Sequence, residues 1–254
     1  MSFDADLTAC AAMVERADPW RFRAAMAAPL ETRKLLFPLY AFNVEVARAP
    51  WVTQETMIAE MRLQWWRDAL EEIAEGKPVR RHEVTTPLAR AITPDDARLL
   101  DELVAARRWD IYKDPFEDEA HFERYIDQTA GHLMWVAARR LGAEDETTVR
   151  NAAYATGIAA WLCAIPTLEE AGRVPLLDGT SKAVSTLAQG ALARLRAARA
   201  NRGNIPSEAQ AALLPAAHAG PVLKAAIAHP GKVSEAALPD PRRHFALRAL
   251  VSRW

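Results

Sequence analysis

Apolar residues along this chain recur at helical spacing. Leu63, Trp66, Leu70 and Ile73 step by three and four residues and form one apolar stripe. The strict alternation of half-buried strands is almost absent. The pattern therefore predicts an all-α protein with residues 1–254 in one domain. The expected helices lie near 4–17, 19–28, 31–49, 53–75, 94–113, 117–141, 145–165, 182–201, 207–217, 220–228 and 241–253.

Local signals mark several boundaries of these helices. Thr93 before Pro94 and two acids supplies an N-cap and a proline at the first helical position. The longest uncharged run is 151–168, which Gly157 and Pro166 interrupt. It falls short of the roughly 20 strongly apolar residues that a membrane span needs. We therefore expect a buried core helix there.

Composition limits the function classes. Half of the 254 residues are hydrophobic and the net charge is −1, which argues against a nucleic-acid partner. Cys10 and Cys163 are the only cysteines, which fits a reducing compartment and excludes a cysteine-built zinc site. Residues 1–20 lack the basic and apolar regions of a secretory signal. We expect a cytoplasmic protein, peripheral to a membrane at most.

The last residues, LPDPRRHFALRALVSRW, combine an apolar stripe with positive charge and carry no acid after Asp240. Residues 241–254 are thus predicted to form a basic amphipathic helix, which suits a membrane surface or a partner's groove. A last helix packed onto the bundle is the equal alternative. The candidate surface residues are Arg242, Arg243, Arg248, Arg253 and Trp254.

Four segments resemble the squalene/phytoene synthase family, the all-α head-to-head prenyl transferases. They are RKLLFPLYAFNVEVA (33–47), MRLQWWRDALEEIAEGKP (61–78), HFERYIDQTAGHLMWVAARRLG (121–142) and GIAAWLCAIPTLEEAGRVPLL (157–177). They occur in the family's order and cover most of residues 15–180. The resemblance implies a single-domain helical bundle of the isoprenoid synthase type.

The resemblance also locates the family's metal site. Active members carry two aspartate pairs, each spaced i and i+4 on one helical face, which hold Mg²⁺ ions and the substrate diphosphate. These positions map to Ala47 and Trp51 and to Ala164 and Leu168. None of these side chains offers a hard oxygen donor. We therefore expect no catalytic residue, no metal and no cofactor, with Mg²⁺ needed only if other acids have taken over.

Other residues could line a residual ligand pocket. Arg33 and Arg67 are the candidates for an anion-binding corner of that pocket. Trp65 and Trp66 are interpreted mainly as packing residues, although one of them could face the pocket. Asp68 and Glu72 are the acids that an active enzyme could use, but they also suit a solvated helix face. The full candidate set is Arg33, Tyr40, Asn43, Glu45, Gln64, Trp66, Arg67 and Asp68.

The family includes a metal-less branch known as assembly factors for respiratory complex I, and the frame LYAFNVEVA…RLQWWRDAL is similar to that branch. The resemblance implies a non-enzymatic helper at the inner face of a membrane. Its expected partner is a protein, such as a complex I subunit, or an isoprenoid or other lipid. Two alternatives remain open. One is an active prenyl diphosphate transferase, and the other is a carrier that binds an isoprenoid without reacting.

Overall fold

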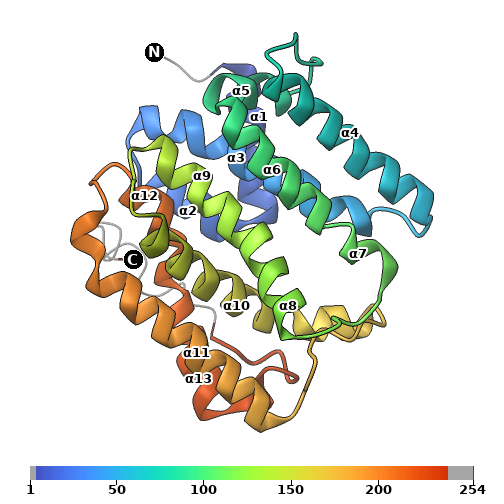
Figure 1. The fold of residues 1–254 in the computed structure, drawn as a ribbon, viewed down its shortest axis with the longest axis vertical. Coiled ribbons are helices and arrows are strands. Elements are labelled where there is room, and N and C mark those ends of the chain that lie inside the picture. Colours follow the sequence, from blue (N-terminus) through green and yellow to red (C-terminus); the bar gives the residue numbers. More distant parts are fainter. Residues whose placement is uncertain (1–3, 240–253) are drawn as a thin grey trace.

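A computed structural model describes residues 4–239 and 254, and over these residues it contains helices and no strand (Figure 1). The prediction of an all-α bundle is confirmed. The α-helices are α1 (Ala5–Ala17), α2 (Pro19–Met26), α3 (Leu30–Arg48), α4 (Thr56–Ala74), α5 (Thr85–Ala91), α6 (Pro94–Ala106), α7 (Trp109–Tyr112), α8 (Glu119–Ile126), α9 (His132–Arg140), α10 (Glu146–Glu170), α11 (Ser181–Ala200), α12 (Gln210–Leu213) and α13 (Ala219–Ala228). Short 3₁₀ turns are η1 (Ala49–Trp51), η3 (Arg202–Asn204), η4 (Leu214–Ala217) and η5 (Pro230–Lys232), and η2 (Asp127–Gly131) is a π-helical turn.

The bundle is built around α10, which packs against α9, α11, α13 and η2. Its apolar residues face all directions, as expected for a helix covered on every side. The core helix expected over 151–168 is therefore confirmed. The helix α3 contributes a run of buried residues from Leu35 to Val44. The space between α3 and α10 holds the cavity described below.

Some helix boundaries differ from the prediction. The helix expected to end at residue 165 continues through Pro166 to Glu170. Proline removes one backbone donor, and burial of Ile165 and Leu168 on either side holds the segment helical. The segment 94–113 divides into α6 and α7, and 117–141 is interrupted by η2. The short helix α5 was not predicted, because seven residues carry too little periodic signal.

The predicted start of α6 is confirmed in detail. The Oγ1 atom of Thr93 accepts a hydrogen bond from the amide of Asp96 at 3.3 Å, and Asp96 Oδ2 accepts one from the amide of Thr93 at 2.8 Å. This reciprocal pair is a capping box. At the end of α3, Pro50 lies in the turn η1 and the helix stops at Arg48.

Two apolar segments bear on membrane contact. Residues 210–228 are long and apolar enough to span a membrane by composition, yet 67% of the stretch is buried within the bundle, as in a core element. The helix predicted over 241–254 lies outside the described residues except for Trp254. The side chain of Trp254 is buried, and its carbonyl accepts a 2.9 Å hydrogen bond from Arg199 Nε.

Candidate functional site

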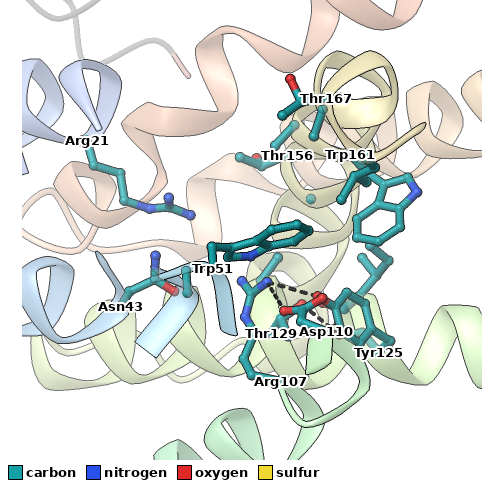
Figure 2. A pocket seen from close by; sticks show the side chains of 17 residues that line it. Arg21, Asn43, Trp51, Arg107, Asp110, Tyr125, Thr129, Thr156, Trp161 and Thr167 are labelled. Atoms are coloured by element: carbon teal, nitrogen blue, oxygen red, sulfur yellow. Dashed lines mark hydrogen bonds and ion pairs between the residues drawn. The ribbon is translucent and has the colours of Figure 1, made fainter. Parts of the chain in front are cut away.

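A cavity of about 440 Å³ opens between α3, α10 and η2 (Figure 2). Most of its lining is apolar, and its volume falls within the range of small-molecule sites. Its charged side chains lie in two places, Arg21 beside Asn43, and Arg107 and Asp110 beside Tyr125, while Thr156 and Thr167 add hydroxyls from α10. The cavity therefore has an apolar interior with polar groups on its wall.

All four positions that the resemblance assigns to metal-binding aspartates line this one cavity. Ala47 and Trp51 come from the end of α3 and η1, and Ala164 and Leu168 come from α10. The helices thus bring the two i, i+4 pairs to the same space, but neither pair carries an oxygen ligand. Over the residues that the structure describes, no group of three His, Cys, Asp or Glu side chains could hold a metal ion.

Asp110 is the single carboxylate among the described residues that line the cavity. Its Oδ2 lies 3.2 Å from Arg107 Nη1, and its Oδ1 accepts a hydrogen bond from Tyr125 Oη at 2.9 Å. Arg107 Nη1 also donates to Tyr125 Oη at 2.8 Å. This one carboxylate is already paired with a cation, whereas the family's cluster uses two aspartate pairs. The cavity therefore does not fit a magnesium cluster of the family type.

Burial shapes the electrostatics of this triad. Asp110 and Tyr125 are almost fully buried. Burial raises the pKa of the Tyr125 phenol, so the hydroxyl stays protonated and donates to Asp110. Burial works against the charge of Arg107, but the neighbouring Tyr125 and Asp110 outweigh it and raise the pKa of the guanidinium. The triad combines one guanidinium, one carboxylate and one hydroxyl, and the buried Nε of Arg107 has no hydrogen-bond partner among the described residues.

Arg21 faces the cavity from α2 (Figure 2). Asp18 holds it in place, because Asp18 Oδ1 accepts a hydrogen bond from the amide of Arg21 at 3.0 Å and Oδ2 accepts one from its Nη1 at 2.5 Å. Burial alone would raise the pKa of Asp18, but the charge and hydrogen bonds of Arg21 lower it. The guanidinium also lies 5.7 Å from the ring centroid of Tyr40.

A second cavity of about 320 Å³ adjoins the first, and Trp51 and Asp110 line both. Arg173 borders this second space. It is 6% exposed, and its guanidinium lies 4.8 Å from the ring of Trp51 and 5.4 Å from that of Trp109. Burial lowers the pKa of Arg173. An aromatic–cation–aromatic arrangement therefore closes the end of the cavity where the family resemblance places metal ions.

Of the eight residues predicted for a residual pocket, Asn43 lines the cavity. Tyr40 is buried beside Arg21. Arg33 instead closes the C-terminal end of α2, where its Nε and Nη2 donate to the carbonyls of Ala28 and Met26 at 2.8 and 2.7 Å. The structure therefore brings two of the eight to the Arg21 side of the cavity and uses Arg33 as a helix cap.

The remaining five lie elsewhere. Trp66 is a core residue, and Trp65 lies beside it with the ring centroids 4.9 Å apart, so both act in packing. The other four make local contacts: Glu45 with Arg48 at 3.1 Å, Gln64 with Asp68 at 2.7 Å, and Arg67 with Asp101 at 2.7 Å.

Asp68 and Glu72, the acids considered for an active enzyme, lie on the part of α4 that faces away from the core. Glu72 pairs with Arg80 at 2.7 Å, and neither acid lines the cavity. The interpretation of this acidic stretch as a solvated helix face agrees with their positions.

Sequence reasoning missed Arg21, Arg107, Asp110 and Arg173 as cavity residues. For Arg107 and Asp110 a weak signal existed, since an arginine and an acid three apart share one helical face. Arg173 lies within the 157–177 segment that carries the resemblance, but nothing in that segment marks it as a cavity residue. Its contact with Trp109 joins residues 64 positions apart, which no local pattern reveals.

Comparison with known proteins places the chain among its relatives. The chain is 32% identical over 170 residues to the NADH dehydrogenase (ubiquinone) complex I, assembly factor 6 homolog of Drosophila melanogaster, covering 62% of this chain and 50% of that protein. It is 26% identical over 162 residues to the complex I assembly factor 6 of Homo sapiens, with 62% and 48% covered. The chain thus spans about half the length of the curated relatives it matches.

The fold has a counterpart among solved structures. A dehydrosqualene synthase crystallised with a ligand superposes with a TM-score of 0.77 over 98% of this chain and 94% of that one, at 14% sequence identity. That likeness establishes the isoprenoid synthase type of bundle. Residues 14–176 match the family model described as squalene/phytoene synthase. From this match, the order of its motifs and its helical bundle, the chain belongs to the squalene/phytoene synthase family.

Proposed function

We propose that this chain is a non-catalytic member of the squalene/phytoene synthase family that acts as an assembly factor for respiratory complex I. One observation carries the first half: the cavity gathers all four expected aspartate positions and fills them with Ala47, Trp51, Ala164 and Leu168. The second half is supported by the names of its relatives, which are complex I assembly factors. The fold alone would not specify this role.

An assembly factor acts on other proteins, so its partner is a protein, and a complex I subunit is the specific proposal. Complex I is built in a membrane. We therefore place this chain at the inner face of that membrane, as a peripheral protein. The basic residues of the predicted 241–254 helix suit such a location, because anionic lipid headgroups attract arginine.

The test is deletion of the gene in the native host, followed by measurement of NADH:quinone oxidoreductase activity in isolated membranes. We expect this activity to fall while succinate oxidation in the same membranes is unchanged. A tagged chain, purified from membranes and compared with an untagged control by quantitative mass spectrometry, should enrich complex I subunits. Normal complex I activity in the deletion strain would overturn the proposal.

A second candidate function is an isoprenoid carrier, because the cavity remains open at about 440 Å³ even though Trp51 and Trp161 both line it. The test is saturable binding of a non-hydrolysable farnesyl diphosphate analogue that is indifferent to EDTA. Ala160→Trp, which fills the cavity, should abolish that binding, and Leu177→Ala on the surface should not. Absence of binding would remove this candidate.

The enzymatic alternative has the least support, because Asp68 and Glu72 lie outside the cavity. It requires magnesium-dependent release of diphosphate from farnesyl or geranylgeranyl diphosphate, abolished by Asp68→Ala or Glu72→Ala. We expect no turnover at high protein concentration. Turnover that these two variants abolish would revive it.

A further inference from the structure

Exposed apolar side chains concentrate at the start of α4. Met57 and Met61 are 75% and 66% exposed, and Val52 and Ile58 are also exposed. We call these four residues the α4 strip. Trp51, next to Val52 in the chain, is 42% exposed as well. The other large exposed hydrophobic residues in the described part of the chain are Met26, Leu30, Tyr112, Val174 and Leu177. Contiguous exposed apolar groups of this kind mark interaction surfaces, and methionine adapts its shape to varied partners.

The strip occupies the outer side of a helix whose inner side is already covered. Positions 57, 58 and 61 share one helical face. On the opposite side Ala59, Leu63 and Trp66 are buried, and α4 packs against α6. Figure 1 shows α4 at the outer edge of the bundle, where it also contacts η1 and α7. The first half of α4 thus has two apolar sides. One is buried against the bundle, and the other is exposed.

The charge beyond the strip is acidic. Along the second half of α4, a groove of about 570 Å³ runs between α4 and α6. Four carboxylates and two arginines line it, and one of these, Arg98, is paired with Asp95 outside the groove. The other, Arg67, is paired with Asp101 within it. The carboxylates are Glu71, Glu75, Asp101 and Glu102. Glu75 also contacts Lys77, and Glu102 contacts His132 at 2.9 Å. The four carboxylates still outnumber the two arginines that line the groove, so its lining is acidic.

We propose that the α4 strip and the adjacent acidic groove form a docking surface for an amphipathic helix of a protein partner. The apolar face of that helix would cover the strip, and its basic residues would lie along the groove. The acidic groove disfavours a bilayer as the occupant, because the cytoplasmic leaflet is itself negative. The inference rests on the proposed assembly function and identifies the surface through which it acts.

A defined probe tests the surface in solution. The probe is a labelled amphipathic peptide of about 18 residues, long enough for five helical turns, with leucine and methionine on one face and lysines in its second half. A matched peptide carries glutamates in place of the lysines. By fluorescence anisotropy on the full chain, the basic peptide should bind at least about tenfold more tightly than the acidic one. The difference should shrink at roughly 0.5 M salt.

The test variant is the double substitution Met57→Glu/Met61→Glu. The control is Leu177→Glu, which changes an exposed apolar residue outside the strip. The double variant should bind the basic peptide more than about tenfold less tightly than the wild type does. Leu177→Glu should bind it with the affinity of the wild type. Thermal unfolding should match the wild type in both, since all three side chains are exposed. Equal affinities for the two peptides, or for the double variant and the wild type, would overturn the proposal. The proposal would also be overturned if the wild type bound phosphatidylserine vesicles, or formed a dimer, and the double variant did not.

Complementation then separates this inference from the proposed function. In the deletion strain, the wild type and Leu177→Glu should restore NADH:quinone oxidoreductase activity, and Met57→Glu/Met61→Glu should not. If deletion leaves that activity unchanged, the assembly function itself fails. If deletion lowers it and the double variant restores it fully, the function stands and the docking surface is wrong.

Discussion

The guanidinium of Arg173 lies 4.8 Å from the ring of Trp51, and Trp51 stands where the family resemblance places a metal-binding aspartate. The ring of Trp109 lies on the same cation at 5.4 Å. A metal site needs acids at this point, whereas this chain has a buried cation between two aromatic rings. The substitution therefore removes a metal ligand and at the same time places an aromatic ring against a buried cation.

Replacing Trp51 with alanine should destabilise the protein. The ring covers a guanidinium that is 6% exposed, but Trp51 is itself 42% exposed, and a cation–π contact at an exposed site contributes about 0.5–1 kcal/mol. We expect the free energy of unfolding in urea at neutral pH to fall by about 0.5–1 kcal/mol. Trp51→Phe, which keeps an aromatic face, should lose less than half of that. Equal stability of the alanine variant and the wild type would show that Arg173 does not depend on this ring.

The triad of Arg107, Asp110 and Tyr125 gives a second prediction. Asp110→Asn removes the anion that pairs with a buried guanidinium, and breaking such a pair costs about 3–5 kcal/mol. Tyr125→Phe removes one neutral donor and leaves the ion pair, so its cost should be about 1–2 kcal/mol. Urea denaturation of both variants measures the difference.

The order of these two effects is the critical result. If Tyr125→Phe costs as much as Asp110→Asn, the Arg107–Asp110 ion pair is not what holds the triad together. The double variant should cost less than the sum of the two single variants, because both residues contact the same guanidinium.

Much of the fold could be predicted from the sequence, because helical spacing and caps are local signals. The apolar stripe on α4 and the capping box at Thr93 follow from neighbouring residues alone. The failures were places where tertiary packing prevailed over local rules. Pro166 stays inside α10 because buried neighbours hold it, and η2 adds a π-helical turn that no periodicity signals.

The candidate site was predictable in outline only. The resemblance placed Ala47, Trp51, Ala164 and Leu168 at metal positions, and the structure brings them into one cavity. The charged residues of that cavity were missed, since their contacts connect distant parts of the chain. Arg33 and Arg67 were predicted to bind an anion, but each makes local contacts instead. Arg33 caps the end of α2, and Arg67 forms an ion pair with Asp101.

Asp18 should make stability depend on pH. Its pKa is lowered in the folded state, so its contribution is fully present above its unfolded pKa of about 3.9 and is lost as pH falls through the folded value. Asp18→Asn keeps an N-cap but removes the charge beside Arg21. Its free energy of unfolding should be about 1–2 kcal/mol lower at pH 7. In urea titrations the gap to the wild type should narrow below about pH 3.9. A constant gap across this range would contradict the assignment.

Gly157 should tolerate no side chain, because it lies where α10 crosses the end of α8 and η2. A Cβ there would come within 2.8 Å of Ala130 Cβ and 2.9 Å of Ile126 Cγ2. Ala130 has no rotamer that relieves this contact, so the backbones must separate at a cost of about 1–3 kcal/mol. Over most of this range the cost exceeds the roughly 1 kcal/mol that alanine gains over glycine in a helix. The matched control is Gly190→Ala on α11, where nothing lies within 4 Å of the added Cβ. Thermal unfolding should show a lower midpoint for Gly157→Ala and a midpoint raised by about 1–4 °C for Gly190→Ala. If both variants rise together, the helices at Gly157 pack less tightly than this geometry requires.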